Sequence, residues 1–404
     1  MLLTLGGLFA IGLLADLIGR FTPLPRVTVL IGSGIVIGPA MLAIVPASYV
    51  AEWFPTLTAI ALTMVGFLLG QGLTLNEIQT RGRASLWLAI AKVVGSAMVV
   101  FTALWLLGIG VIPAILLSGI AAATDPAATF DVVRESASDG PFTRTLLRIV
   151  ALDDALALML FALLIALAKS IADWNSTDSG ALHLLLAAPA DILGSLCLGI
   201  VLGVPMAYLT GRIESADNAG EPILAEALGF VLICAGCAQY LGLSEILAAM
   251  AMGSTVATLA KHHSKPFAAI EGIEWPFMIL FFILAGASLT FSGVALFGAI
   301  AAAYVVARSI GATLGVYSAA VMLNAAPSQR HWLGPALLPQ AGVAIGMALI
   351  AAQAFPEHAA LLLTCTLLST VVLELLAPIV TRAILVHVRE AGSGALKGDD
   401  SARA

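Results

Sequence analysis

Asp153 and Asp154 are adjacent carboxylates inside Leu146–Ala168, a stretch that is apolar and long enough to cross a bilayer. Each carboxylate at membrane depth costs about 2.5–3.5 kcal/mol on insertion scales, so such residues are retained there for function. Successive residues of a helix point about 100° apart. We therefore predict that one carboxylate coordinates a substrate and the other holds a partner. A purely structural ion pair at a helix crossing is the alternative.

Arg308 lies near the centre of another apolar stretch, Ala301–Ala320. A guanidinium does not lose its proton in proteins, so a buried arginine needs an anion. Asp153 is the candidate partner of Arg308. The arginine is also expected to compensate the partial negative charge at the carbonyl ends of broken helices.

Two further apolar stretches carry a proline and polar groups near their middle. Ala123–Pro126 has the sequence ATDP and Leu338–Gly342 has the sequence LPQAG. Proline removes a backbone donor and clashes one turn back, so each helix is expected to break there. Asp125 would offset the partial positive charge of the half-helix N-termini. Thr124 can offer an oxygen to a cation, or it caps its own half-helix.

Gln340, Glu374 and Lys92 also lie within apolar stretches. Gln340, at the second break, and Glu374, in the last stretch, are candidates for tuning the site, although Glu374 could instead pair with a neighbouring helix. Lys92 lies toward one end of its stretch, where its ammonium group is expected to reach the membrane surface. The candidate ligands of an alkali cation or a proton are therefore Asp154, Asp153 and Thr124.

The composition predicts an all-α polytopic membrane protein. Hydrophobic residues make up 60% of the chain and charged residues 10%, whereas about 25% of an ordinary soluble domain is charged. The sequence has no basic cluster, which argues against nucleic-acid binding. It also has no nucleophile–base pair and no metal-ligand set of the kind that enzymes use. We therefore expect neither an enzyme nor a resident cofactor.

Apolar runs of roughly 17–25 residues predict about thirteen transmembrane helices. They begin near Leu2, Val27, Phe54, Ala84, Val111, Thr143, Pro189, Pro222, Ser244, Pro266, Val294, Trp332 and His358. An odd count suits two inverted six-helix repeats joined by a linker helix, here Pro189–Thr210. The two broken stretches are then the fifth and twelfth spans, at corresponding positions of the repeats. Such a pair of broken spans is the best sequence indication of a transport site.

The basic residues predict the orientation of the chain. One set of loops holds nearly all of the 18 Lys and Arg residues, whereas the opposite loops hold only Lys169, and Lys92 and Arg308 lie inside spans. Cytoplasmic loops carry the excess of positive charge, so we expect an inner-membrane protein with its N-terminus outside and its C-terminus in the cytoplasm. The loop residues on the cytoplasmic side are Arg20, Arg26, Arg81, Arg83, Arg134, Arg144, Arg148, Arg212, Lys261, Lys265, Arg330, Arg382, Arg389, Lys397 and Arg403.

Several of these stretches together resemble the cation/proton antiporter superfamily, and within it the bacterial sodium/proton antiporters with a two-aspartate motif. The resemblance extends from the second span to the eleventh. ATDP followed about 27 residues later by DD is its most specific part. The matching stretches are Gly32–Pro39 (GSGIVIGP), Ala123–Pro126 (ATDP), Leu152–Asp154 (LDD), Gly242–Gly253 (GLSEILAAMAMG), Phe281–Leu289 (FFILAGASL) and the span of Arg308.

The resemblance implies a homodimer in the lipid bilayer and a core domain that slides against a dimerisation domain like an elevator. The membrane domain would occupy residues 1–390, with the core at roughly 84–170 and 294–390 and the dimerisation part at roughly 1–72 and 189–290. Residues 391–404 would form a short cytoplasmic tail.

The resemblance also implies the roles of the site residues. Asp154 would carry the ion or the proton, Asp153 would pair with a basic residue at the position of Arg308, and Thr124 and Asp125 would take the broken-helix role. Two-aspartate members that move net charge usually have lysine at the basic position, whereas electroneutral members combine Asn-Asp with arginine. This chain combines Asp-Asp with Arg308, which leaves its stoichiometry open.

The sequence thus predicts a secondary active antiporter that exchanges Na⁺ or Li⁺ for protons, because hard oxygen ligands suit an alkali cation. Asp154 would bind either the cation or a proton, and this competition would couple the two fluxes. The alternatives are K⁺/H⁺ exchange, glutathione-gated K⁺ efflux, a sodium-coupled symporter of an organic anion on a similar fold, and a sensor or scaffold without flux.

Overall fold

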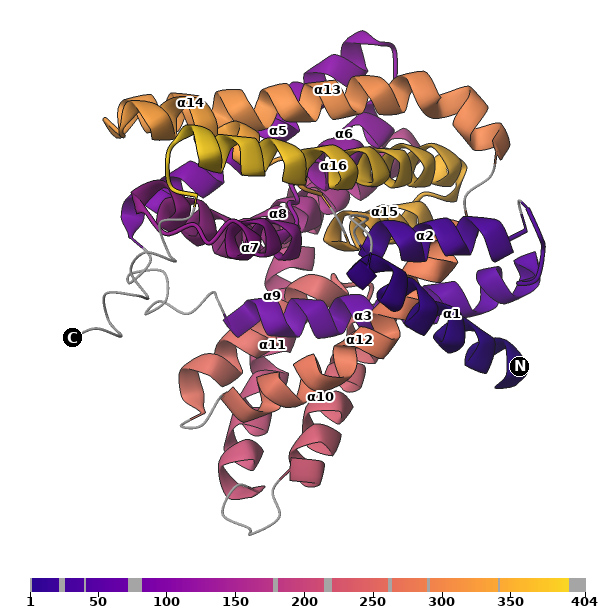
Figure 1. Ribbon diagram of the computed structural model, residues 1–404. Coiled ribbons are helices and arrows are strands. Elements are labelled where there is room, and N and C mark those ends of the chain that lie inside the picture. The colour runs from indigo at the N-terminus through magenta and orange to yellow at the C-terminus, as the bar shows by residue number, and fades with distance from the viewer. Residues whose placement is uncertain are drawn as a thin grey trace. The chain divides into compact units, whose positions relative to one another are not determined.

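The structure is a computed structural model that describes residues 2–21, 26–39, 41–71, 82–176, 181–213, 220–260, 264–288, 291–340 and 342–391. Every regular element in these ranges is a helix (Figure 1). Within them, seven helices are long and apolar enough to cross a membrane. The expectation of an all-α membrane protein is therefore confirmed. Each expected span coincides with one helix or with a pair of half-helices, while the total of thirteen spans stays a prediction.

The chain divides into two compact units, which are described separately. Unit 1 consists of Met1–Phe21, Val29–Ile78 and Leu158–Thr290. Its helices are α1 (Leu2–Phe21), most of α2 (Arg26–Ile37), α3 (Ala47–Gly70), the second half of α8 (Pro141–Ser176), α9 (Ala181–Ile213), α10 (Gly220–Leu241), α11 (Glu245–Leu259) and α12 (Ser264–Ala287).

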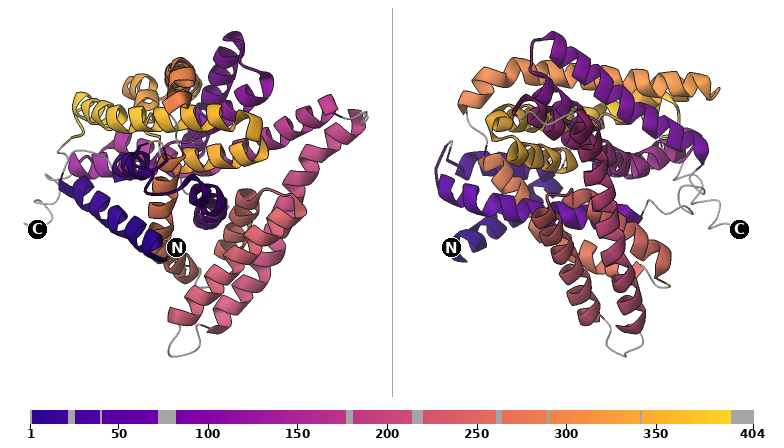
Figure 2. Two further views of the ribbon diagram at one scale, coloured as in Figure 1. Left: turned by 90° about the vertical axis from the view of Figure 1, so that its right-hand side faces the viewer. Right: turned by 180° about the vertical axis from the view of Figure 1, so that it is seen from behind.

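Unit 1 is held together by apolar side chains and by close backbone contacts. Helix α11 packs against α3 and α9, and Figure 2 shows α9, α10 and α11 as neighbours. The rings of Phe67 and Phe267 stack in its core with centroids 4.6 Å apart. A Cβ atom on Gly253 would lie 2.1 Å from the carbonyl oxygen of Phe67. Small residues let membrane helices approach this closely, because lipid gives apolar side chains no drive to associate.

Unit 2 consists of Thr22–Thr28, Gln79–Ala157 and Phe291–Ala404. Its helices are α5 (Arg83–Leu106), α6 (Val111–Ile120), α7 (Pro126–Glu135), the first half of α8, α13 (Phe291–Met322), α14 (Pro327–Ala336), α15 (Gly342–Ala354), the short 3-10 helix η2 (Pro356–His358) and α16 (Ala359–His387).

Helices α5 and α13 pack closely against each other in unit 2 (Figure 1). A Cβ atom on Gly315 would lie 2.1 Å from the carbonyl oxygen of Ala91, and one on Gly95 would lie 2.8 Å from that of Gly311. Ala91 directly precedes Lys92, and Gly311 lies about one turn after Arg308. The glycine contact therefore holds the two basic residues at similar positions along the paired helices.

The fifth and twelfth spans are broken, as the sequence predicted. Helix α6 gives way to α7, whose first residue is Pro126, and α14 gives way to α15 after Pro339. Proline suits the first helical position because the N–H that it lacks would have no partner there. The backbone N–H of Asp125 donates to the carbonyl oxygen of Pro339 at 3.0 Å. The two breaks therefore lie directly against each other.

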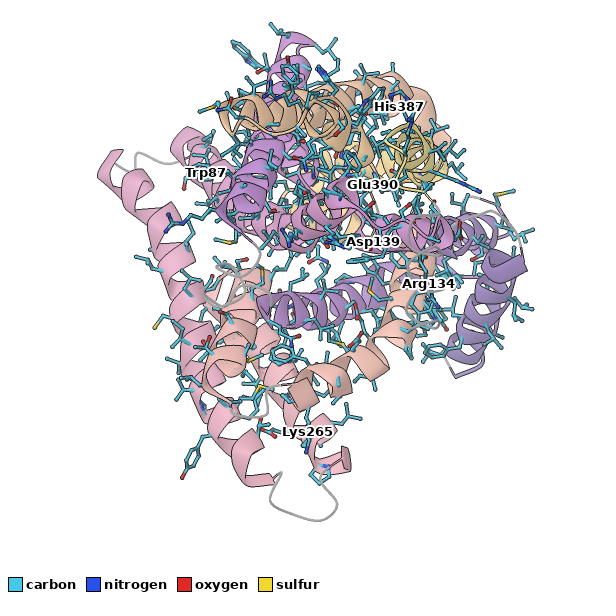
Figure 3. All side chains as sticks on the ribbon, turned by 60° about the vertical axis from the view of Figure 1, so that its left-hand side comes forward. Trp87, Arg134, Asp139, Lys265, His387 and Glu390 are labelled. Atoms are coloured by element: carbon cyan, nitrogen blue, oxygen red, sulfur yellow. The ribbon has the colours of Figure 1, made fainter. Side chains whose placement is uncertain are left out.

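Helix α8, which carries the aspartate pair, is fixed at its N-terminus by a carboxylate that lies just beyond the end of α16. Glu390 accepts hydrogen bonds from the backbone N–H groups of Phe142 and Thr143 at 2.9 and 2.8 Å, and Figure 3 shows Glu390 near Asp139 in the preceding loop. An acidic group favours this end of a helix because its N–H groups have no helical partner. A Cβ atom on Gly140 would lie 2.1 Å from the Glu390 carboxyl carbon.

Several sequence predictions stay predictions. The assignment of the two parts of the chain to transport and dimerisation is one of them, and the orientation in the membrane is another. Most of the expected cytoplasmic tail, residues 392–404, lies outside the described residues, as do the loop residues Arg81 and Lys261.

Candidate ion-binding site

The two aspartates of α8 are both buried, and their surroundings differ. Asp153 is 0% exposed and Asp154 is 4% exposed. One oxygen of Asp153, Oδ2, accepts a hydrogen bond from Lys92 Nζ at 2.6 Å and another from Thr124 Oγ1. Asp154 Oδ1 has no hydrogen-bond partner within the described part of the chain. The two carboxylates thus differ in their partners, because Asp153 is held by Lys92 and Thr124 whereas Asp154 has no ion pair, and Oδ1 of each lacks a partner among the described residues.

The predicted partner of Asp153 was wrong. Asp153 forms its ion pair with Lys92 and not with Arg308. Lys92 was expected to extend to the membrane surface, but it is fully buried and also donates to the carbonyl oxygen of Ala122 at 2.6 Å. The sequence could not show which of two buried cations faces Asp153, because that depends on how α5 and α13 are rotated against α8.

The position of Lys92 along its helix was a signal that the sequence analysis missed. Lys92 lies nine residues after Arg83, the first residue of α5. At about 1.5 Å per residue it is roughly 14 Å along the helix, close to the middle of a hydrocarbon layer of about 30 Å. Such a lysine is too deep to reach either surface with ease, and it therefore needs a buried anion.

Arg308 binds the backbone of both breaks. Its Nε donates to Ala121 O at 3.0 Å, its Nη1 to Leu338 O at 2.8 Å, and its Nη2 to Ala123 O at 2.6 Å. A longer contact of 3.4 Å joins Nη2 to Pro339 O. These carbonyls follow the C-terminal ends of α6 and α14, where half-helices carry partial negative charge. The contact with half-helix ends that the sequence suggested is present, and its electrostatic role stays a proposal.

Asp125 and Gln340 lie at the breaks themselves. Asp125 directly precedes α7 and is one of the charged groups that act on Asp154, together with Asp153 and Lys92. Gln340 is buried. Its Nε2 donates to Tyr304 Oη at 3.2 Å, and Ser369 Oγ donates to its Oε1 at 3.3 Å.

Glu374 is also buried, at 2% exposure, on α16. It lies about one helical turn beyond Thr370, whose hydroxyl has no partner among the described residues. The tuning roles that the sequence suggested for Glu374 and Gln340 stay predictions.

The leftover oxygens indicate what the site can do chemically. Oδ1 of Asp153 and Oδ1 of Asp154 are both buried without a hydrogen-bond partner in the described residues. A buried acceptor without a partner costs about 1–3 kcal/mol, and more when it is charged, so native proteins retain few of them. Two such oxygens on adjacent residues can accept an alkali cation, or they can be relieved by a proton.

The chain was compared with known proteins. It matches the family profile described as sodium/hydrogen exchanger, transmembrane, over residues 7–387. The chain belongs to the sodium/hydrogen exchanger family. Membership in this family supports exchange of a cation for protons across a membrane as the activity of this exchanger.

A relative of this exchanger occurs in Alkalihalophilus pseudofirmus. It is the ammonium/H(+) antiporter subunit AmhT, which is 22% identical over 276 residues, or 68% of this chain and 67% of the relative.

Solved structures of the sodium proton antiporter MjNhaP1 from Methanocaldococcus jannaschii share the fold. The structure at pH 8 has a TM-score of 0.73 and 17% identity, and the match covers 96% of this chain and 98% of that one. The electron-microscopy map of the same antiporter gives a TM-score of 0.65 and 16% identity, with 95% and 96% covered. The likeness confirms the sodium/proton antiporter fold that the sequence predicted.

Proposed function

We propose that this exchanger moves Na⁺ or Li⁺ in one direction and protons in the other, with Asp154 as the group that carries either ion. The observation that supports this most is that Asp154 is buried with no ion pair and with an oxygen that has no partner among the described residues, whereas Asp153 is already paired with Lys92. Asp154 is therefore the group for which a bound cation or proton makes the largest difference.

The coupling follows from the charge of the buried site. An isolated ionised carboxylate in a low-dielectric environment is unfavourable, and a proton or a cation relieves the same charge. Asp154 cannot bind a proton and a cation tightly at the same time, so each ion displaces the other. A carrier that is unstable when empty crosses the membrane mainly when loaded, which links the two fluxes.

The neighbouring groups have supporting roles in this proposal. Asp153 offers a second oxygen to the cation while Lys92 and Thr124 hold its other oxygen in place. Arg308 stabilises the broken backbone by binding carbonyl groups on both sides of the crossing. Asp125 adds negative charge near Asp154 and thereby favours a cation there.

All of these residues belong to unit 2. We propose that unit 2 moves as the carrier in an elevator mechanism, because such a mechanism requires the moving part to hold the whole site. We also propose a homodimer in the inner membrane, with the N-terminus outside and the C-terminus in the cytoplasm.

Ammonium is a second candidate cation, because the relative AmhT is named as part of an ammonium/H(+) antiporter. An ammonium ion donates hydrogen bonds, and the two carboxylate oxygens that lack a partner in the described part of the chain are acceptors. Potassium is the third candidate and is best tested alongside it.

The test uses the purified chain in liposomes that enclose a pH-sensitive dye. We expect Na⁺ or Li⁺, added outside, to drive proton efflux, whereas choline should not. Ammonia crosses bilayers unaided, so ammonium is tested as a competitor of radioactive Na⁺ uptake. If no alkali cation drives proton flux and ammonium does not bind, the proposed function is wrong. If only K⁺ or ammonium is active, the antiport stands and the assigned cation is replaced.

A further inference from the structure

A group of buried polar side chains in unit 2 lies beside the second break. Its members are Gln340 at the break, Tyr304 on α13 and Ser369 on α16, and each is 0% exposed. Gln340 Nε2 donates to Tyr304 Oη at 3.2 Å, Ser369 Oγ donates to Gln340 Oε1 at 3.3 Å, and Tyr304 also hydrogen-bonds Ser369. These side chains therefore close a polar ring of hydrogen bonds.

The donors and acceptors of the polar ring fit together in one direction. Gln340 Nε2 also faces the carbonyl oxygen of Ile120, at 3.5 Å. A carbonyl oxygen only accepts, so the amide nitrogen lies on that side and Oε1 faces Ser369, whose hydroxyl can donate. Tyr304 accepts from Gln340, which leaves its own proton for Ser369. Each side chain of the ring thus donates to the next, and hydrogen bonds in such a chain polarise and strengthen one another.

Ser369 also has an acceptor in its own helix. Its Oγ lies 2.8 Å from the carbonyl oxygen of Thr366 and 3.3 Å from Gln340 Oε1. A hydroxyl has one proton to donate, so the ring is closed when that proton points to Gln340. Ser318 on α13 offers a comparison, because its hydroxyl donates at 2.8 Å to Gly315 O in its own helix. Removing each hydroxyl in turn therefore measures what the ring contributes.

Helix α13 holds the second break from one side. Tyr304 and Arg308 lie four residues apart, and residues at this spacing share one face of a helix. Arg308 binds the carbonyl oxygens of Leu338 and Pro339, and Tyr304 binds the side chain of the next residue, Gln340. One face of α13 therefore contacts three successive residues of the break. The polar ring adds a second contact from α16, which packs against α13 (Figure 1).

We propose that Tyr304 and Ser369 are positioning residues, which fix Gln340 and thereby set the affinity of the exchanger for its cation. This inference rests on the function proposed above. It adds residues that act through a neighbour and not on the cation itself.

A series of contacts joins the polar ring to the carrier carboxylate through the two breaks. Gln340 directly follows Pro339, whose carbonyl oxygen accepts from the backbone N–H of Asp125 at 3.0 Å. Asp125 is one of the charged groups that act on Asp154. The interaction of two charges depends on their separation and is strong where the medium screens poorly. A displacement of Gln340 therefore moves Asp125 and changes the attraction of the site for a cation.

The polar ring should affect binding more than movement. All of its members belong to unit 2, which moves as one body in the elevator mechanism proposed above, so its hydrogen bonds need not break during transport. Loss of the ring should raise the KM for Na⁺ and leave the maximal rate little changed. A residue needed only for folding would instead lower the amount of active protein, and with it the maximal rate, at an unchanged KM.

The first experiment removes one hydroxyl from the ring. In proteoliposomes, Tyr304→Phe should raise the KM for Na⁺ of the proton flux roughly three- to tenfold, the effect of one lost hydrogen bond. The control is Tyr317→Phe on the same helix, whose ring contacts His331 and which should keep the wild-type KM. An unchanged KM in Tyr304→Phe, or a lower maximal rate alone, would overturn this inference and leave the proposed function standing. A wild type without cation-driven flux would overturn the proposed function, and this inference with it.

The second experiment is a double-mutant cycle. Tyr304→Phe and Ser369→Ala each open the same ring, so the double variant should raise the KM by much less than the product of the two single increases. Combining Tyr304→Phe with Ser318→Ala should give the product of the single effects, because the Ser318 hydroxyl bonds within its own helix. A wild-type KM in Ser369→Ala, or independent effects of Tyr304→Phe and Ser369→Ala, would contradict the ring.

A binding measurement covers a variant that folds but does not transport. In detergent, calorimetric titration with Na⁺ should give a Kd that rises in Tyr304→Phe and Ser369→Ala by the same factor as the KM. Thermal unfolding without Na⁺ shows whether each variant is folded. A folded Tyr304→Phe or Ser369→Ala variant with the wild-type Kd would overturn the assignment of that residue.

Discussion

Unit 1 and unit 2 are both built from apolar helices in close backbone contact, but they bury different polar groups. The buried polar side chains of unit 1 are neutral hydroxyls: Thr63, Ser170, Ser195 and Thr210. Every buried charged side chain among the described residues belongs to unit 2: Lys92, Asp125, Asp153, Asp154, Arg308 and Glu374.

The difference shows what helix packing accomplishes in each unit. In unit 1 the contact of Gly253 with Phe67 O joins helices that bury only apolar groups and hydroxyls. In unit 2 the equivalent contact of Gly315 with Ala91 O lies beside a lysine and near an arginine whose charges must meet acceptors at hydrogen-bond distance. A small displacement therefore affects only stability in unit 1, whereas in unit 2 it also affects the site.

The largest expected effect comes from Asp154, because its Oδ1 has no partner among the described residues and it lacks the ion pair that Asp153 has. Asp154→Asn should reduce Na⁺-driven proton flux to the level of protein-free liposomes while the protein still folds. Asp139→Asn, which changes an acidic residue in the loop before α8, should keep the flux. Substantial Na⁺-dependent flux from Asp154→Asn would mean that Asp154 is not the carrier and that the contrast between the units concerns stability alone.

The second-largest expected effect is the loss of stability when the buried ion pair of Lys92 and Asp153 is broken. Removing one partner, as in Lys92→Met, leaves Asp153 charged and unpaired and should destabilise the protein by about 3–5 kcal/mol. Adding Asp153→Leu should restore much of that loss, because no unpaired charge remains. The matched change in unit 1, Thr63→Val, removes a hydroxyl that bonds to Ala59 O in its own helix and should cost about 1 kcal/mol or less.

Apparent unfolding temperatures in detergent give the order of these variants. If Lys92→Met is no less stable than Thr63→Val, then breaking the buried ion pair of unit 2 costs no more stability than removing a buried hydroxyl from unit 1.

A smaller effect distinguishes the two glycine contacts. A methyl group at Gly253 or at Gly315 would overlap a carbonyl oxygen, so either change to alanine should cost about 1–3 kcal/mol. Only Gly315→Ala should also weaken Na⁺ binding, since it displaces α5 and α13 beside Lys92 and Arg308. Na⁺ titration and thermal unfolding of both variants make the comparison.

Glycines with open space serve as controls for this pair. At Gly229 in α10 and Gly298 in α13, an added methyl group would have no neighbouring atom within 4 Å. Alanine there should raise stability by roughly 0.5–1 kcal/mol, because glycine is unfavourable inside a helix. Equal loss of Na⁺ affinity in Gly253→Ala and Gly315→Ala would remove the distinction between the units.

The smallest effect concerns the N-terminus of α8. Glu390→Gln replaces a charged acceptor of two backbone N–H groups by a neutral one, and we expect a loss of about 1 kcal/mol. Glu135→Gln, an exposed change at the end of α7, should be nearly neutral. Thermal unfolding at low and high salt tests this, because salt screens an exposed charge more than a partly buried one. No difference between the two variants would show that the Glu390 carboxylate does not stabilise the N-terminus of α8.

Much of the fold could be predicted from the sequence because its signals are local. The length of the apolar runs follows from the thickness of the bilayer, and the breaks follow from Pro126 and Pro339, which act on the backbone of their own helix. The divergence of Asp153 and Asp154 also follows from helix geometry alone. Their environments differ accordingly: Lys92 and Thr124 donate to Asp153, whereas Asp154 has no ion pair, and each keeps one oxygen without a partner among the described residues.

By itself, the sequence determined that charged groups lie at membrane depth and that two helices break beside them. Only the tertiary structure decided which charges meet. Lys92 reaches Asp153 because glycines on α5 and α13 bring those helices into backbone contact, and Arg308 reaches the carbonyls because the two breaks cross. Each outcome depends on the rotation of one helix against another, and contacts distant in the sequence set that rotation.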